Sequence, residues 1–166
     1  YIPAEYGGAG LDQISYGLIM QEIERGDSGV RSTASVQSSL VMYPIYAYGS
    51  EEQREKYLPK LAMGSMKSAY CLTEPDAGSD ANAGKTKARL SEDKKSYLLN
   101  GQKMWISNAG FADLFIVFAK IEDDKYLSAF IVEKEFGGIT MNPEEKKLGI
   151  KGSSTRQVFF NDCKVP

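Results

Sequence analysis

The stretch YLLNGQKMWIS, residues 97–107, decides how the second half of this chain folds. Its two ends are rich in aromatic and aliphatic residues, and Asn100-Gly101 lies between them. An Asn-Gly pair is typical of a two-residue hairpin turn, because both central positions of that turn need a positive φ. We therefore expect a β-hairpin with strands at 97–99 and 102–106.

Other segments after residue 66 also have the composition of strands. Runs rich in β-branched and aromatic residues predict strands at 114–119, 127–132 and 157–160. The segment 122–125, Glu-Asp-Asp-Lys, has the polar composition of a turn between two of these strands.

Before residue 66 the apolar residues recur at three- and four-residue steps, which is typical of amphipathic helices. The first predicted helix has Asp12 as its cap and Gly26 as its end. A second is predicted at about 30–48, where Pro44 predicts a kink or a break. The capping box at 50–53 opens a third. The apolar stripe of the first helix consists of Leu11, Ile14, Leu18, Ile19 and Ile23.

A run of helices followed by a run of strands indicates an α+β fold rather than a βαβ sheet. We expect a helical domain at 1–66 and an antiparallel, β-barrel or sandwich-like domain at 67–166. The length of 166 residues fits one domain or two small ones.

Composition excludes several classes of protein. The net charge of −2 and the pI near 5.3 argue against a nucleic-acid binder, which would carry a basic face. No window holds eighteen consecutive apolar residues, so no transmembrane helix is expected. Histidine is absent, which excludes Ser-His-Asp and Cys-His catalysis and every histidine-containing metal site. We expect no metal.

Two isolated cysteines, Cys71 and Cys163, favour a reducing, intracellular environment over a secreted disulfide scaffold. We expect both to be small buried hydrophobic residues. No signal peptide is visible, and the sequence opens at Tyr1 without a methionine. We expect the chain to be a piece of a longer protein.

Three groups of residues are candidates for binding. In the turn-rich loop at 70–80, Gly78 and Ser79 could offer backbone amides to an anion, although a simple turn has the same composition. Trp105 and Ser107, two apart on a strand, could present an aromatic plane and a hydroxyl to a planar ligand; alternatively Trp105 lies in the core. P-loop and Rossmann fingerprints are absent.

The third candidate group flanks a helix break at 26–29. Arg31 lies just after the break and Glu24 just before it. The arginine can form a structural ion pair with this glutamate or bind a carboxylate on a ligand. From the residues alone, a general base, a nucleophile and a metal all stay unassigned.

Taken together, these segments resemble the acyl-CoA dehydrogenase family over essentially the whole chain. YCLTEPDAGSD at 70–80 and NGQKMWISN at 100–108 look like the two flavin signatures of that family. The resemblance implies that 1–66 is the end of an N-terminal helical domain and 67–166 the middle β domain. It also implies FAD as the cofactor, bound by Tyr70, Leu72, Thr73, Gly78, Ser79, Trp105, Ile106 and Ser107.

In such an enzyme these residues would surround the flavin. Thr73 would donate to the pyrimidine edge of the ring, Trp105 would cover the ring, and Ser107 would hydrogen-bond near the nitrogen that accepts hydride. The reaction implied is α,β-dehydrogenation of an acyl-CoA thioester, in which a carboxylate removes the α proton. That base is normally a glutamate of the C-terminal helical domain, expected after Pro166. We therefore expect no catalytic residue in this chain and no turnover by it alone.

The two halves resemble different branches of the family. Residues 31–50 look like the glutaryl-CoA dehydrogenase branch, in which Glu24, Arg31 and Ser32 match positions around the distal carboxylate of the substrate. Ser79 is a further substrate contact by the same resemblance. From about residue 69 onward the chain looks more like branches that act on fatty acyl-CoAs. We expect a glutaryl-type or short-chain substrate, with Arg31 as a carboxylate clamp.

Alternatives are a medium- or long-chain acyl-CoA dehydrogenase, an acyl-CoA oxidase and, in a different class, a non-catalytic binding or assembly module of the same fold. The resemblance also implies fatty acid or amino acid degradation, an electron-transfer flavoprotein as acceptor and a homotetramer or homodimer. The compartment would be bacterial cytoplasm or the mitochondrial matrix.

Overall fold

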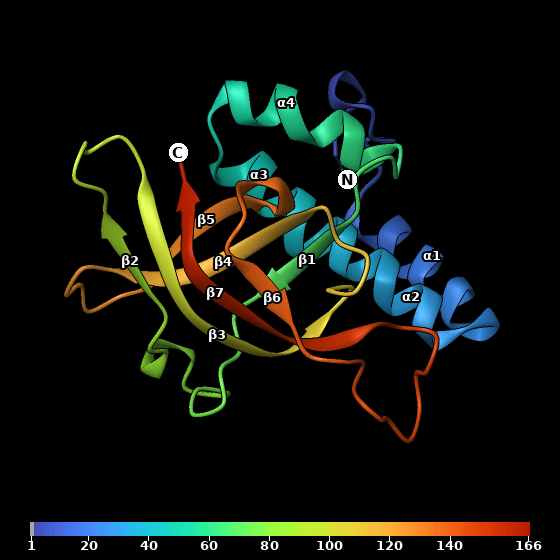
Figure 1. Cartoon of the computed structure of the whole chain (residues 1–166). Helices are drawn as coiled ribbons and strands as arrows, with labels where there is room; N and C mark the ends of the chain where they lie inside the picture. The colour runs from blue at the N-terminus through green and yellow to red at the C-terminus, as the bar shows by residue number, and fades with distance from the viewer. Residues whose placement is uncertain (1) are drawn as a thin grey trace.

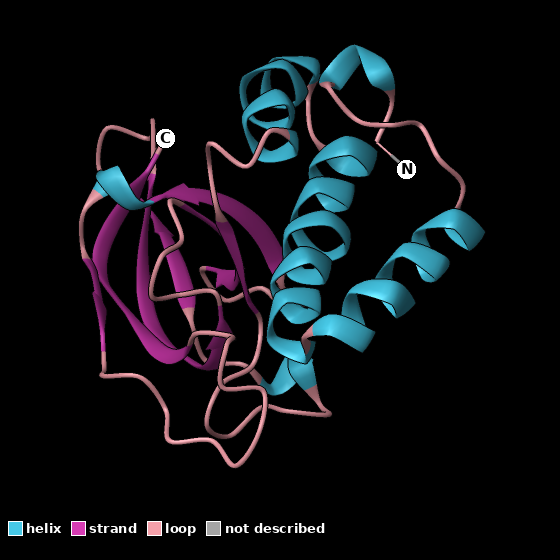
Figure 2. Cartoon of the chain, turned by 90° about the vertical axis from the view of Figure 1, so that its right-hand side faces the viewer, coloured by secondary structure: helices cyan, strands magenta, loops and turns pink. Residues whose placement is uncertain are grey.

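The computed structural model describes residues 2–166, and its helices precede its strands along the chain. The helices gather on one side of a strongly curved sheet, as Figure 2 shows. Figure 1 shows α4 crossing one end of the sheet, on the side where the chain also ends. The predicted α+β fold class is confirmed.

The helical part consists of η1 (Ala4–Tyr6), α1 (Gln13–Gly26), α2 (Ser28–Ser35), η2 (Val36–Met42), α3 (Tyr43–Tyr48) and α4 (Glu51–Ala62). The strands are β1 (Ser68–Cys71), β2 (Lys87–Leu90), β3 (Tyr97–Ser107), β4 (Leu114–Ile121), β5 (Ser128–Glu133), β6 (Ile139–Met141) and β7 (Thr155–Val165). Two short 3-10 turns, η3 (Ala81–Ala83) and η4 (Lys134–Phe136), interrupt the connections between strands.

The predicted helix ends are confirmed. The Asp12 carboxylate accepts a hydrogen bond from the Ser15 amide at 2.8 Å, which caps α1. At the start of α4 the Ser50 amide donates to Gln53 Oε1 at 2.9 Å, and the Gln53 amide donates back to Ser50 Oγ at 3.3 Å. This is the predicted capping box.

The predicted break at Pro44 takes another form. The helix continues through this position, and its irregularity is the seven-residue π-helix η2, which ends just before Pro44. Pro44 is the second residue of α3, directly after this irregular stretch of helix.

The apolar stripe of α1 is exposed in this structure. No residue of α1 is buried, and the Ile14 and Leu18 side chains are 74% and 59% exposed. The helix forms where the pattern predicts it, but most of its apolar stripe is left exposed by the other residues at 2–166.

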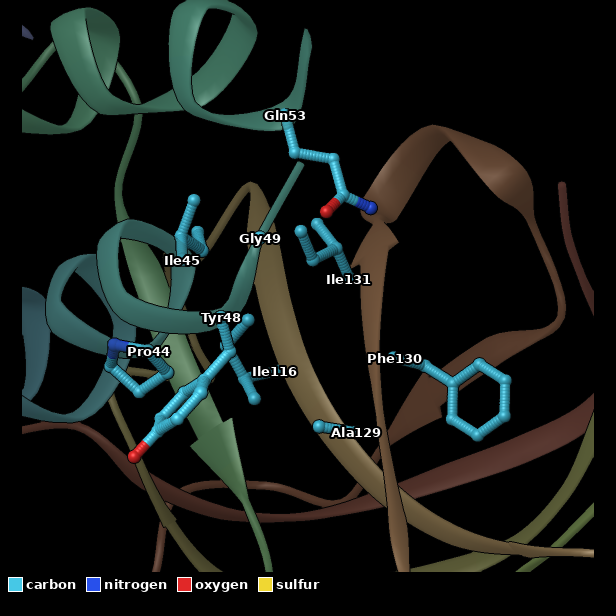
Figure 3. A pocket seen from close by; sticks show the side chains of 9 residues that line it. All are labelled: Pro44, Ile45, Tyr48, Gly49, Gln53, Ile116, Ala129, Phe130 and Ile131. Atoms are coloured by element: carbon cyan, nitrogen blue, oxygen red, sulfur yellow. The ribbon is translucent and has the colours of Figure 1, made fainter. Parts of the chain in front are cut away.

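Strand β4 lies between two cores. Leu114 and Ile116 are buried in a cluster with residues of η1, η2, α3 and α4, whereas Phe115 and Val117 are buried in the core of the β domain. Alternate side chains of a strand point to opposite faces, so one strand serves both clusters. A pocket remains where α3 and the start of α4 meet β4 and β5 (Figure 3).

The strands form a seven-stranded sheet in the order β1-β4-β2-β3-β7-β6, with β5 paired to β4. Most ladders are antiparallel, as predicted. However, β1 and β2 both pair with β4 in parallel, which the sequence analysis did not anticipate.

The predicted hairpin at Asn100-Gly101 is wrong. β3 runs unbroken from Tyr97 to Ser107 and pairs antiparallel with β7, with a register shift between Leu99 and Gly101. Asn100 therefore lies opposite two residues of β7, Asn161 and Asp162, so the Asn-Gly pair faces a β-bulge of β7 instead of forming a turn. Gly101 has φ 150°, which a residue with a Cβ rarely adopts. The Asn100 side-chain amide nitrogen donates to Asp162 Oδ1 at 2.9 Å, which ties β3 to the bulge of β7.

Both cysteines are free and buried, as predicted. Burial raises the pKa of Cys71 to about 12 and that of Cys163 to about 11, so neither thiol ionises at neutral pH. Within residues 2–166 there is no helix long and apolar enough to cross a membrane.

Gly101→Ala tests the close packing of β3 on Thr86, opposite the bulge of β7. A Cβ at position 101 would lie 2.5 Å from Thr86 Oγ1 and 2.8 Å from Thr86 Cα, in addition to the strain of a positive φ. We expect a loss of about 1–3 kcal/mol in the free energy of unfolding, measured by chemical denaturation. Gly149→Ala is the control, because a Cβ there meets nothing within 4 Å. Equal stability of the two variants would contradict the close packing of Gly101 on Thr86.

Candidate functional site

The two segments singled out in the sequence, 70–80 and 100–108, lie side by side. β1 ends at Cys71, and the loop that follows runs against β3. The Met104 amide donates to the Thr73 carbonyl at 2.8 Å, which joins the two backbones directly. Residues more than thirty positions apart thus form one surface.

A buried ion pair lies beneath this contact. Lys103 Nζ donates to Glu74 Oε1 at 2.8 Å and to the Leu72 carbonyl at 3.1 Å. The side chains of Lys103 and Glu74 are 0% and 6% exposed. Burying two charges is costly unless further hydrogen bonds satisfy them. The Glu74 carboxylate accepts two more, from the backbone amides of Lys85 and Thr86.

These contacts set the charge state of the pair. Burial by itself would raise the pKa of Glu74, but hydrogen bonds from Lys103 and from residues 85 and 86 outweigh it and lower the pKa below its ordinary value. Burial lowers the pKa of Lys103, and Glu74 acts against that shift. Glu74 is therefore a carboxylate at neutral pH.

Trp105 is presented to the outside by a distortion of β3. The register of β3 with β7 shifts between Lys103 and Ile106, and Trp105 within the shift has φ 60°. Its side chain is 55% exposed, so the alternative that it belongs to the core is wrong. A bulky residue in this conformation costs of order 1–3 kcal/mol, and such strain clusters at binding sites.

Three hydroxyls of the two segments are free of protein partners. In the part of the chain that the structure describes, no hydrogen bond is formed by the hydroxyls of Thr73, Ser79 or Ser107. Thr73 and Ser107 are half-buried and Ser79 is exposed. Donors left without a partner beside an exposed indole suit a planar, polar ligand.

The remaining predicted residues contribute in other ways. The Tyr70 ring packs edge-on against Phe118, with centroids 5.1 Å apart. Leu72 is half-buried and offers its carbonyl to Lys103. Ile106 is 2% exposed and lies in the β core, so only its backbone can face a ligand. Gly78 is exposed, just beyond the tight turn at 74–77.

Glu24 and Arg31 meet at the turn between α1 and α2. Arg31 Nε donates to Glu24 Oε2 at 2.5 Å, and Arg31 also reaches Ser35 Oγ at 3.5 Å. Ser32 lies on the same helix, α2. Figure 1 shows this turn and the loop between β1 and β2, which carries Ser79, on opposite sides of the molecule. The structure brings Glu24 and Arg31 together, but not with Ser79.

Sequence reasoning missed Lys103, Glu74 and Asn108 as residues that build the site. The Asn108 amide nitrogen donates to the Ser68 carbonyl at 3.0 Å and to the Thr33 carbonyl at 3.4 Å, which ties the end of β3 to β1 and α2. A signal was present for Lys103. Counting by twos from Leu99 places it on the core side of β3, where a lysine needs a partner.

The pocket of Figure 3 does not belong to this site. Its lining comes from α3, the α3–α4 turn and strands β4 and β5, and is mostly apolar. Gln53, a polar residue of the lining, already accepts a hydrogen bond from Ser50. None of the residues predicted to bind a ligand lines it.

Glu74→Gln tests the buried pair through stability and pH. At pH 7 we expect a loss of about 3–5 kcal/mol in the free energy of unfolding, because Lys103 loses its buried partner. The folded pKa of Glu74 lies below 4.5, so its contribution is present above pH 4.5 and disappears as the pH falls through the folded value. The acid limb of the stability curve should be shallower in Glu74→Gln than in the unmodified protein.

Asp76→Asn is the control for that measurement. Asp76 pairs with Lys85 at 2.8 Å, but both side chains are more than 70% exposed. Exposed pairs add little to stability. A Glu74→Gln stability curve that matches that of Asp76→Asn would contradict the role given to the pair.

Two family models match this chain. The model described as acyl-CoA dehydrogenase, middle domain, matches residues 69–163, and the model described as acyl-CoA dehydrogenase, N-terminal domain, matches residues 1–65. A probable acyl-CoA dehydrogenase of Bacillus subtilis (strain 168) is 52% identical over 165 residues, which cover 99% of this chain and 27% of that protein. The mitochondrial very long-chain specific acyl-CoA dehydrogenase of Homo sapiens is 46% identical over 173 residues, covering 99% and 26%.

Solved structures agree. An acyl-CoA dehydrogenase complexed with FAD from Bacillus anthracis superposes with a TM-score of 0.95 at 50% identity, covering 99% of this chain and 28% of that one. A glutaryl-CoA dehydrogenase from Mycobacterium smegmatis in complex with FADH2 gives 0.90 at 42% identity, covering 97% and 41%. The chain thus spans about a quarter of the curated relatives it matches. With one family model matching more than half of its length, the chain belongs to the acyl-CoA dehydrogenase family.

Proposed function

We propose that this chain is the flavin-binding part of a longer FAD-dependent acyl-CoA dehydrogenase. The observation that carries the proposal is the joining of segments 70–80 and 100–108 at Thr73 and Met104. Together they carry the exposed ring of Trp105 and the hydroxyls of Thr73, Ser79 and Ser107, which no described residue bonds. FAD, when bound, would supply the acceptor for the β hydrogen of the acyl group. The exposed apolar stripe of α1 also fits a larger protein in which other residues cover it.

The roles proposed for the cofactor residues follow from where they lie. Thr73 and Ser107 would donate hydrogen bonds to polar edges of the ring, and Trp105 would cover its face. Ile106 would contribute its backbone, since its side chain is in the core. Tyr70 and Leu72 would line the edge of the site, while Gly78 and Ser79 would reach the more polar parts of the ligands.

No residue of this chain is proposed as the base that removes the α proton. We place that carboxylate in the part of the enzyme that follows the middle domain, so that this chain alone would not turn over an acyl-CoA. We also propose two structural units, a helical one at 1–66 and a β unit at 67–166. An acyl-CoA oxidase and a non-catalytic module of the same fold are the competing functions.

For the substrate we propose a glutaryl-type or short-chain acyl-CoA, held by Arg31 with Glu24 and Ser32, and with Ser79 as a separate contact. Arg31 has five N–H donors, and the described residues accept from only two of its nitrogens. The donors left over can bind a carboxylate. The relatives named for glutaryl-CoA and for very long chains match this chain at similar identity, so identity does not discriminate between these substrates. The choice of a glutaryl-type substrate therefore rests on Arg31.

As partners we propose an electron-transfer flavoprotein as acceptor and a second copy of the enzyme, in a homodimer or homotetramer. A solved structure described as the electron transferring flavoprotein of Acidaminococcus fermentans is similar to this chain, with a TM-score of 0.92 at 44% identity, covering 99% of this chain and 44% of that one. The named relatives include a bacterial protein and a mitochondrial one, which fits the bacterial cytoplasm or the mitochondrial matrix.

The visible absorbance of the full-length protein that carries this chain tests the proposed activity. We expect a flavin band that bleaches when glutaryl-CoA is added without oxygen, because the reaction reduces the flavin. A band bleached by palmitoyl-CoA and unchanged by glutaryl-CoA would retain the dehydrogenase and reject the glutaryl substrate. Peroxide formation in air would favour the oxidase. A protein with no band after addition of FAD would favour the non-catalytic module.

Arg31→Ala in the same full-length protein tests the substrate clamp. We expect kcat/KM for glutaryl-CoA to fall about 10- to 100-fold, because a charged hydrogen-bonded pair is lost, while that for butyryl-CoA changes little. Arg25→Ala is the control, since Arg25 pairs with Glu22 on the exposed side of α1. Equal losses on both substrates would show that Arg31 has only a structural role.

A further inference from the structure

The buried pair Lys103–Glu74 has no role in the function proposed so far. Its position is unusual, because each member lies within two positions of a residue proposed to touch the flavin. Glu74 follows Thr73 directly, and Lys103 precedes Trp105 by two positions. The pair is therefore built into both segments at once.

Lys103 lies where regular pairing of β3 with β7 stops. It is in register with Val158, and the next residue in register is Ile106, opposite Arg156. The distortion that exposes Trp105 begins directly after Lys103. A strained conformation persists only when the surrounding structure fixes it, and an anchor is needed at this point.

Lys103 and its neighbour Met104 supply that anchor, through three hydrogen bonds to residues 72–74. The Lys103 ammonium donates to the Leu72 carbonyl and to the Glu74 carboxylate, and the Met104 amide donates to the Thr73 carbonyl. Two consecutive residues of β3 thus bond to Thr73 and to the residues on either side of it. The Glu74 carboxylate is itself held by the backbone amides of residues 85 and 86, just before β2.

Stability alone does not explain this arrangement. Apolar residues of similar volume often stabilise a core as well as a buried ion pair does, whereas ionic hydrogen bonds fix one geometry. The pair spans the short distance between the segment that carries the Thr73 hydroxyl and the one that carries Trp105 and Ser107.

We propose that Lys103 and Glu74 are positioning residues of the flavin site, which set Thr73 against Trp105 and Ser107. This inference rests on the flavin site proposed above. Neither residue touches the flavin. Lys103 acts through the backbone of residues 72–73 and through the bulge that carries Trp105.

The test uses the full-length protein that carries this chain, freed of FAD and titrated with it. Three variants are compared: Lys103→Met, the double variant Glu74→Gln/Lys103→Met, and Lys56→Met as control. The control breaks an ion pair of similar length, 2.6 Å from Lys56 to Glu133, between α4 and β5. The readouts are the Kd for FAD, the visible circular dichroism of the bound flavin and the melting temperature without FAD.

We expect Lys103→Met to raise the Kd for FAD about tenfold or more and to change the dichroism of the flavin. The double variant leaves no unpaired buried charge, so its melting temperature should recover toward that of the unmodified protein. Its Kd and flavin dichroism should stay altered, because the bond from Lys103 to Leu72 is still missing. Lys56→Met should lower the melting temperature at most and leave both flavin readouts unchanged.

Recovery of both stability and flavin binding in the double variant would overturn the proposal, because the pair would then act only on stability. A Lys103→Met protein that binds FAD with unchanged Kd and dichroism would also overturn it. If the unmodified protein binds no FAD, the proposed function fails and this inference fails with it. The first two results leave the proposed function standing, so the two failures are distinguishable.

Discussion

The ammonium of Lys103 and the carboxylate of Glu74 are both withdrawn from water, and each satisfies the other. Neither charge is tolerable in the core alone, so the loop after β1 and the middle of β3 must fold against each other. That contact brings the Thr73 hydroxyl near the distorted end of β3. The proposed flavin surface follows from this one constraint, because its donors come from segments that the chain separates by some thirty residues.

A second constraint is that alternate side chains of β4 point to opposite faces of the strand. Its side chains enter the helical cluster and the β core in turn, so the helical part and the β part share one buried strand. β1 pairs in parallel with β4 along four residues, and β1 leads directly into the loop at 72–80. The helices therefore contribute to the site indirectly, by fixing the strand against which β1 is placed. Asn108 adds a direct link between these layers.

Two differences between expectation and structure arise in one pair of strands, β3 and β7. Asn100-Gly101 suits a hairpin turn, but here it lies within a continuous strand, opposite a bulge of β7. The outcome depends on β7, which pairs with both halves of β3. The exposure of Trp105 follows from a second register shift in the same pair of strands. Both outcomes are set by long-range strand pairing, which no window of the sequence contains.

Several features followed from the sequence alone: the order of helices and strands, the caps at Asp12 and Ser50, and the burial of the cysteines. The two motifs at 70–80 and 100–108, which indicate the family, are also read directly from it. Each depends on local hydrogen bonding, hydrophobic period or residue identity, which are read within a few neighbours. Three features came only from the assembled fold: Asn100-Gly101 lies opposite a bulge of β7, Trp105 faces outward, and Lys103 reaches Glu74. Those features depend on which distant backbone and charge each residue meets, and that is fixed only when the strands assemble.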